Sequence, residues 1–203
     1  MFYVDDNGYI DDSRIVVKAF NNIQRGKLDQ VNGIVVHQTD SKTKESVFNS
    51  YQRENANGAH FLIDKNGIIY QTASLHSLTW HVGKSQSRCF IEHKCEPAEF
   101  KNIFQLEKST TGKSKVSKME QKKPFPERYP INTDSIGIEI VGKAYKVENE
   151  GDAVYEDVND KQNESLVWLV KELTSTLKVP MTEIYRHPDI GRKNTTEAST
   201  AKW

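Results

Sequence analysis

The sequence lacks any long apolar run, any excess of charge of one sign and any cysteine-rich pattern. No stretch approaches the roughly 18 apolar residues that a transmembrane helix needs, so no membrane span is expected. Lys and Arg together number 28, and Asp and Glu also number 28. Because nucleic-acid binding relies on surplus basic side chains to neutralise phosphates, nucleic acid is not expected as a partner. The N-terminus, MFYVDDNGYIDD, has no basic region followed by an apolar stretch, so the sequence predicts no secretory signal peptide.

Only two cysteines are present, Cys89 and Cys95, which is too few for a small domain held together by disulfides. Their spacing fits either one local bridge or two free thiols, and the sequence leaves both open. The hydrophobic fraction of 36% is low but sufficient for a core, and the well-mixed charges do not indicate global disorder. At 203 residues the chain therefore fits one domain with an elaborated loop.

Short apolar runs predict the strands of one sheet. Residues 33–39 read GIVVHQT, and residues 134–142 read DSIGIEIVG, in which isoleucines alternate with other residues as in a strand with one buried face. Residues 60–71, HFLIDKNGIIYQ, are two strand-like runs around an Asn-Gly pair, which supplies the positive φ angles of a tight hairpin turn. A further short strand, EIYRH, is expected to end at His187.

Two segments have the periodicity of amphipathic helices. Residues 43–55 carry apolar side chains at three- and four-residue spacing, and residues 162–178 carry a leucine-rich stripe that ends before Pro180. Strands and helices mix along the chain without an internal repeat. The predicted fold class is α/β, a single domain with a central mixed β-sheet flanked by helices.

Two parts of the chain fall outside this pattern. Residues 1–30 are mostly polar and are expected to form an N-terminal extension that packs on the main domain, residues 31–203. Within that domain, residues from about 84 to 131 are rich in Lys, Glu, Ser and Thr and close with PFPERYP, whose prolines disfavour regular structure. We expect a long, only partly ordered insertion on one face, which shapes access to a site rather than forming core.

Two histidines stand where strands are expected to end, His37 after GIVV and His187 after EIYR. A single such histidine is commonly a partly buried ring satisfied by hydrogen bonds. Two of them, together with Glu139 on the strand face opposite the isoleucines, favour a metal site, because neutral imidazole is the commonest zinc ligand. A nearby carboxylate that does not bind the metal can then act as general base on a metal-activated water. The alternative for Glu139 is a charge on an exposed sheet face.

Five motifs, taken in order, resemble a known family: GIVVHQT, GAHFLIDKNGIIYQ, TWHVG, DSIGIEIVG and YRHPDIGRKN. Over roughly residues 30–203 they resemble the type-2 N-acetylmuramoyl-L-alanine amidase domain, whose family includes peptidoglycan recognition proteins and phage lysozyme-type amidases. The resemblance implies zinc-dependent hydrolysis of the amide between N-acetylmuramic acid and L-alanine in peptidoglycan or muropeptides. It also implies that His37 and His187 are zinc ligands, that Glu139 is the catalytic base and that Lys193 supports the oxyanion.

The sequence departs from this family at the third zinc ligand. The family has Cys or Asp two residues after the lysine, whereas here that residue is Thr195, and a neutral hydroxyl is a poor zinc ligand. Glu197 lies two residues further on and is the predicted third ligand, because it has a carboxylate on a longer arm. The alternatives are a two-histidine site completed by water and the loss of zinc, which would leave a non-catalytic peptidoglycan-binding module.

Two other histidines fall within the motifs. His81, in TWHVG, is expected to contact substrate or to act as a donor in the transition state, and the alternative is a packed loop residue. His60 opens the predicted hairpin, where a structural or substrate-facing role is favoured over metal ligation. Trp80 is expected to form a groove wall or to fill the core.

The segments YPINTDSIGIEIVGKA and RHPDIGRKN are most similar to amidases of type VI secretion effectors. This resemblance implies an antibacterial effector that is made in the cytoplasm, exported and active in the periplasm of a target cell. It also implies an immunity protein that blocks the groove as a second partner, besides the peptidoglycan substrate. The alternatives are cytosolic recycling of muropeptides and a phage-type lysin released at lysis.

Overall fold

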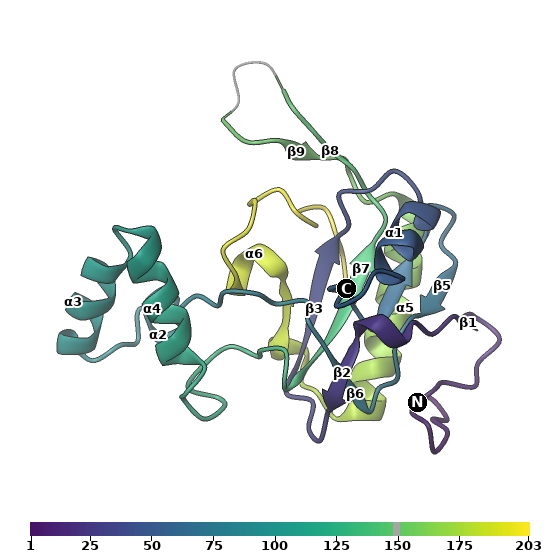
Figure 1. The fold of residues 1–203 in the computed structure, drawn as a ribbon. Helices are drawn as coiled ribbons and strands as arrows, with labels where there is room; N and C mark the ends of the chain where they lie inside the picture. The colour runs from purple at the N-terminus through teal and green to yellow at the C-terminus, as the bar shows by residue number, and fades with distance from the viewer. Residues whose placement is uncertain (148–150) are drawn as a thin grey trace.

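The computed structural model describes residues 1–147 and 151–203, and a six-stranded mixed sheet forms its centre (Figure 1). The strand order is β1-β5-β4-β7-β3-β10. These strands are β1 Ile15–Val17, β3 Gly33–Gln38, β4 Phe61–Ile63, β5 Ile69–Gln71, β7 Ser135–Ile140 and β10 Ile184–Arg186. β4 and β5 pair antiparallel, and all other neighbours in this sheet pair parallel. The predicted α/β class with a central mixed sheet is confirmed.

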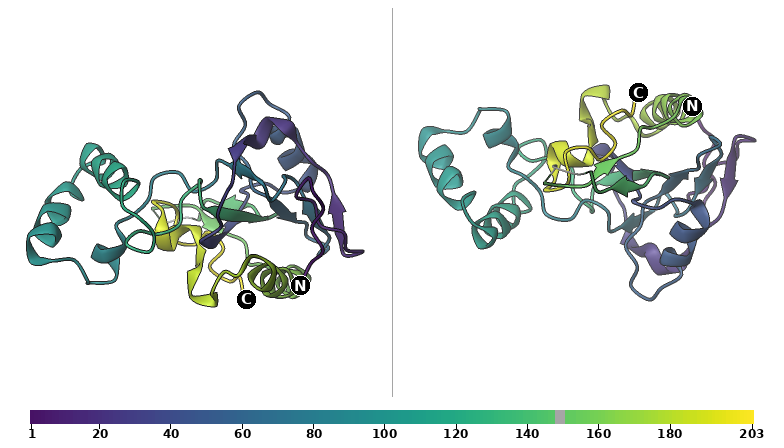
Figure 2. Two further views of the ribbon diagram at one scale, coloured as in Figure 1. Left: turned by 90° about the horizontal axis from the view of Figure 1, so that it is seen from below. Right: turned by 90° about the horizontal axis from the view of Figure 1, so that it is seen from above.

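Helices cover both faces of the sheet (Figure 2). α5 (Asp160–Leu177) lies on one face, where its leucines cluster with the isoleucines of β7. α1 (Lys44–Tyr51) lies on the other face, and its Phe48 and Tyr51 pack with Leu62 of β4. Since neighbouring residues of a strand point to opposite faces, the isoleucine face of β7 is buried under α5 and Glu139 points away from it.

Both helices begin where the sequence provides a cap. The Thr43 side chain accepts a hydrogen bond from the backbone N–H of Ser46, and Asn159 and Gln162 form a reciprocal capping box. α5 ends at Leu177 and is capped by Lys178, which has a left-handed backbone, shortly before Pro180. α5 therefore matches the helix predicted over residues 162–178 within two residues at each end.

The hairpin of β4 and β5 is confirmed, with a wider loop than a two-residue turn. The backbone N–H of Asp64 donates to the carbonyl oxygen of Ile68 at 2.9 Å, which closes a three-residue loop. The positive φ angle falls on Gly67, at 86°, and not on Asn66. This is a type I turn followed by a left-handed glycine, the arrangement that three-residue hairpin loops favour.

The first 30 residues contribute directly to the sheet and its core. β1 forms one edge of the sheet by pairing with β5, and Phe2, Ile10 and Leu28 belong to the largest hydrophobic cluster. β2 (Gln24–Lys27) pairs antiparallel with β6 (Ser77–Thr79), so this segment is tied to the main domain at two places.

The insertion contains three helices that project from the sheet region (Figure 1), which corrects the expectation of partial order. They are α2 Arg88–Ile91, α3 Pro97–Leu106 and α4 Thr110–Glu120. Pro97 stands in the first turn of α3, and the Ser109 side chain caps α4 by accepting from the backbone N–H of Gly112. A disulfide joins Cys89 to Cys95, which settles the alternative that the sequence left open.

The remaining described elements are short. They are the 3₁₀ helices η1 Asn21–Ile23 and η2 Met181–Glu183, the hairpin of β8 Ala144–Tyr145 and β9 Val154–Tyr155, and α6 His187–Ile190. The strand predicted to end at His187 ends at Arg186, and His187 is the first residue of α6. Among the described residues, no helix combines the length and apolarity needed to cross a membrane.

Candidate metal centre and active site

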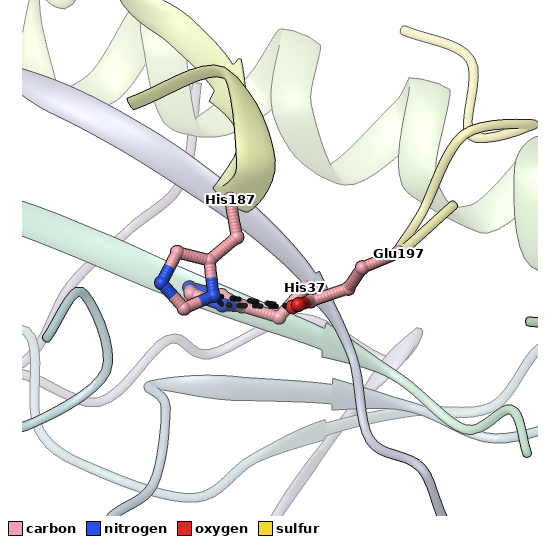
Figure 3. A group of neighbouring side chains, drawn as sticks. All are labelled: His37, His187 and Glu197. Carbon is pink, nitrogen blue, oxygen red and sulfur yellow. Dashed lines mark hydrogen bonds and ion pairs between the residues drawn. The ribbon is translucent and has the colours of Figure 1, made fainter. Parts of the chain in front are cut away.

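Three buried side chains converge at the carboxyl end of β3: His37, His187 and Glu197 (Figure 3). The Nδ1 atoms of the two histidines are 2.8 Å apart. Glu197 Oε1 lies 3.2 Å from His187 Nδ1 and 3.5 Å from His37 Nδ1. All three residues are at most 5% exposed. The histidines anticipated from the sequence are therefore brought together with the predicted carboxylate.

Glu197 reaches this point because the C-terminal segment turns back onto the sheet. The backbone N–H of Ala198 donates to the Gln38 side chain at the end of β3, and Ala198 itself has a positive φ of 53°. The Arg186 guanidinium donates to the carbonyl oxygens of Ala198 and Ala201, which holds the returning segment. Thr195, by contrast, is exposed and is not among the residues that line the cleft.

The protonation of the cluster suits a cation. His187 Nε2 lies 2.7 Å from the carbonyl oxygen of Val82, which only accepts, so this nitrogen carries the proton and Nδ1 offers a lone pair to the centre. Burial and the neighbouring His187 lower the pKa of His37 to about 4, so the ring is neutral at pH 7. Burial alone would raise the pKa of Glu197, but its contacts with the two histidines outweigh this and lower that pKa to about 2.

These groups fit a zinc ion. Two neutral imidazoles and one carboxylate are a known ligand set of catalytic zinc sites, which keep a fourth position open. Lone pairs 2.8 Å apart repel one another unless a cation or a proton lies between them. The Arg186 contacts to the chain around Ala198 and the Val82 contact to His187 hold two of the ligands in place before any ion binds.

Glu139 lies beside the cluster on the neighbouring strand. In the parallel pairing of β3 with β7 it is the register partner of His37, so both side chains lie on the same face of the sheet. The Tyr51 hydroxyl donates to Glu139 Oε2. Burial raises the pKa of Glu139 to about 7, although the bond from Tyr51 opposes the shift. A carboxylate with such a pKa is poised to exchange protons near neutral pH.

The cluster opens into a cleft of about 520 Å³. The three clustered side chains line it together with Glu139 and the exposed Lys193. Its walls include Asn57, Trp80, Asn132 and Tyr155. Trp80 is 45% exposed, so it forms a wall of the groove and does not fill the core.

The sequence of this chain matches one family over most of its length. Residues 27–198 match the family described as N-acetylmuramoyl-L-alanine amidase. The chain belongs to this amidase family. The matched range contains the three clustered residues, Glu139 and Lys193, as well as the whole helical insertion.

Solved structures share the amidase fold at low sequence identity. A selenomethionine derivative of AmpD superposes with a TM-score of 0.58 at 15% identity, covering 99% of this chain and 95% of that one. The catalytic domain of XlyA gives a TM-score of 0.52 at 18% identity, covering 88% and 87%. AmpDh3 from Pseudomonas aeruginosa gives 0.53 at 21% identity, covering 96% of this chain and 61% of that one. Comparison with curated protein sequences finds no match.

In this amidase, both other motif histidines are engaged within the protein. His60 is fully buried, its Nε2 donates to the carbonyl oxygen of Ser77, and its Nδ1 accepts from the backbone N–H of Gly137. His81 lines the cleft, but its Nδ1 is 3.0 Å from His37 Nε2 and its Nε2 is 3.2 Å from Ser135 Oγ. Each ring nitrogen of His81 therefore has a partner within the protein.

Two residues of the amidase site, Tyr51 and Asn132, were not predicted from the sequence as site residues. Tyr51 belongs to the apolar stripe of α1, yet its hydroxyl bonds to Glu139. Asn132 lies in the loop after the insertion, yet its side chain bonds to the backbone at His81 and Val82. A buried tyrosine at the end of an amphipathic helix, or an asparagine in a Pro-rich loop, is ordinarily read as packing or turn formation.

Proposed function

We propose that this chain is a zinc-dependent amidase that hydrolyses the amide between N-acetylmuramic acid and L-alanine of the peptidoglycan stem peptide. Membership in the N-acetylmuramoyl-L-alanine amidase family supports the reaction class. The observation that carries the zinc dependence is the buried group of His37, His187 and Glu197, next to Glu139 in an open cleft.

Each side chain of the cleft has a role in this proposal. His37, His187 and Glu197 would hold the ion, which when bound would acidify a water molecule and polarise the scissile carbonyl. Glu139 takes the proton from the attacking water and returns it to the leaving nitrogen of L-alanine, which its pKa near 7 suits. Lys193 places a positive charge at the cleft, where the oxyanion of the tetrahedral intermediate develops.

The competing function is a peptidoglycan-binding module without catalysis. The observation in its favour is Thr195, a poor zinc ligand, at the position where the family has its third ligand. Glu197 supplies a buried carboxylate at the cluster, so the ligand set needs no contribution from Thr195. The retained Glu139 and Lys193 also favour an enzyme, because a binding module has no use for a general base.

The test is digestion of defined muropeptides by purified protein, read by mass spectrometry, with zinc content measured on the same sample. We expect about one zinc per chain and release of a stem peptide with a free L-alanine amino group. The matched control is Glu139→Gln, which keeps zinc and loses turnover. Full activity after exhaustive chelation would refute the zinc dependence, and zinc-loaded protein that binds but never cleaves would favour the binding module.

We also propose that the protein is an antibacterial effector, acting in the periplasm of a target cell after export, with an immunity protein that covers the cleft. Its resemblance to type VI secretion amidases and the Cys89–Cys95 disulfide support this, because disulfides persist in oxidising compartments such as the periplasm. We expect directed expression in the periplasm of Gram-negative cells to cause lysis and cytoplasmic expression to be tolerated. The Glu139→Gln variant is the matched control, and equal tolerance of both proteins in the periplasm would contradict the proposal.

A further inference from the structure

One short segment, His81 and Val82, contacts the rings of both candidate ligand histidines. The carbonyl oxygen of Val82 accepts from His187 Nε2 at 2.7 Å. The side chain of His81 meets the other ring, with 3.0 Å between its Nδ1 and His37 Nε2. Each ligand ring is therefore bonded, through the nitrogen that faces away from the cluster, to one of two adjacent residues.

The hydrogen-bond chain behind His81 determines which nitrogens carry protons. Ser135 Oγ lies 2.7 Å from the carbonyl oxygen of Ile131, which only accepts, so the single hydroxyl proton is used there. Ser135 Oγ lies 3.2 Å from His81 Nε2 and must then accept a hydrogen bond from that nitrogen. His81 accordingly carries its proton on Nε2 and presents the lone pair of Nδ1 to its neighbour.

The proton on His81 Nε2 also determines the tautomer of His37. Since His81 Nδ1 accepts, His37 Nε2 must donate, and the lone pair of His37 is left on Nδ1. That nitrogen faces His187 and Glu197. A metal ligand histidine whose other nitrogen donates to a fixed acceptor is held in the tautomer and orientation that binding requires.

Asn132 holds this segment in place. Its Oδ1 accepts from the backbone N–H groups of both His81, at 3.0 Å, and Val82, at 2.8 Å. Gly137 leaves space for the ring, because a Cβ atom there would lie 2.8 Å from His81 Cγ. The arrangement joins three separate parts of the chain.

We propose that His81 and Val82, held by Asn132, position both zinc-binding imidazoles, so that His81 is a positioning residue and not a substrate contact. This inference rests on the proposed zinc centre. It gives the TWHVG segment of this chain a role at the metal site, through the side chain of His81 and the backbone of Val82.

Two pairs of variants test the proposal. His81→Leu removes the acceptor for His37 Nε2, whereas His81→Asn has nearly the same shape as leucine and keeps an oxygen close to the position of Nδ1. Likewise Asn132→Leu removes the acceptor for the two backbone N–H groups, whereas Asn132→Asp keeps it. His76→Leu, at an exposed histidine outside the cleft, is the control for loss of an imidazole.

The readouts are zinc affinity by chelator competition, the absorption spectrum of the cobalt-substituted protein, and KM and kcat. We expect each leucine variant at His81 and Asn132 to weaken zinc binding about 10- to 100-fold and to alter the cobalt spectrum. The Asn and Asp variants should recover most of that loss, and the His76 variant should match the wild type.

A rise in KM or a fall in kcat in His81→Leu, with zinc affinity and cobalt spectrum unchanged, would overturn the proposal and make His81 a substrate contact. Thermal melts of the metal-free proteins report whether a variant is folded. If a leucine variant does not fold, the Asn and Asp variants decide. They should keep most of the zinc affinity of the wild type, and a loss of about 10- to 100-fold in them would refute the tautomer argument. A wild-type protein that binds no zinc would instead refute the proposed function.

Discussion

Replacement of Glu197 by glutamine is expected to weaken zinc binding steeply, while Thr195→Ala leaves it nearly unchanged. Glu197 Oε1 lies 3.2 and 3.5 Å from the two histidine nitrogens, and the residue is 5% exposed. Glutamine keeps the shape but removes the negative charge and leaves a neutral amide oxygen. Thr195 is exposed and does not line the cleft, so we expect no contribution from its hydroxyl.

The magnitude follows from ligand chemistry. Loss of a partner that only orients a ligand costs about 10- to 100-fold in metal affinity, so loss of a direct charged ligand should cost about 100-fold or more. A 100-fold loss equals about 2.8 kcal/mol at 25 °C. At a free zinc concentration of about 1,000 times the wild-type Kd, zinc stabilises the wild type by about 4.1 kcal/mol and the variant by about 1.4 kcal/mol.

The assay is chelator competition, combined with thermal melts at fixed free zinc. For a domain of this size, the difference of about 2.7 kcal/mol corresponds to a gap of about 5–11 °C in the zinc-induced rise of Tm. Metal-free melts of both variants serve as the baseline. If Thr195→Ala lost zinc and Glu197→Gln kept it, the hydroxyl or a water that it holds would be the third ligand, and the geometric reasoning would be refuted.

Three further predictions concern the base and the insertion. Glu139→Gln should keep the fold and zinc, since the Tyr51 hydroxyl can still donate to the amide oxygen, but should lose roughly 10²-fold or more in turnover; near-normal turnover would remove this carboxylate from the mechanism. Because the general base must be ionised, kcat/KM should fall as pH drops through the pKa of Glu139. Burial raises that pKa to about 7, and a bound cation lowers it from there. The fall of kcat/KM at low pH should be absent in the Gln variant. Deletion of residues 90–122 with a short glycine-serine linker should leave a folded, zinc-binding protein with altered KM, because the buried apolar side chains of the deleted residues, Ile103 and Val116, lie outside the three core clusters; outright unfolding by circular dichroism would make the insertion part of the core.

Local sequence pattern was sufficient for much of the fold. The alternating isoleucines predicted the buried face of β7 and so the opposite direction of Glu139. The apolar spacing within residues 43–55 and the leucine stripe of residues 162–178 predicted the two covering helices, and the Asn-Gly pair predicted the hairpin. These features depend on residues within a few positions of one another, whose periodicity a single chain displays directly.

The insertion shows where local pattern was insufficient. Its composition is polar, and its closing prolines disfavour regular structure, so its order was underestimated. Helices form there because α3 and α4 pack together and bury Ile103 and Val116, and because a disulfide closes the turn after α2. Burial of one helix against another depends on tertiary packing more than on the propensity of either helix alone.

The sequence by itself determined that His37, His187 and Glu139 belong to one site, because strand ends and strand faces can be read from short runs of residues. Only the tertiary structure shows that Glu197 lies beside the two histidines while Thr195 is exposed, since that depends on how the returning C-terminal segment meets β3. It likewise decided that His81 bonds to a ligand ring, 44 residues away in sequence. Such contacts join segments whose separation along the chain carries no periodic signal, so they exist only once the sheet has brought its strand ends together.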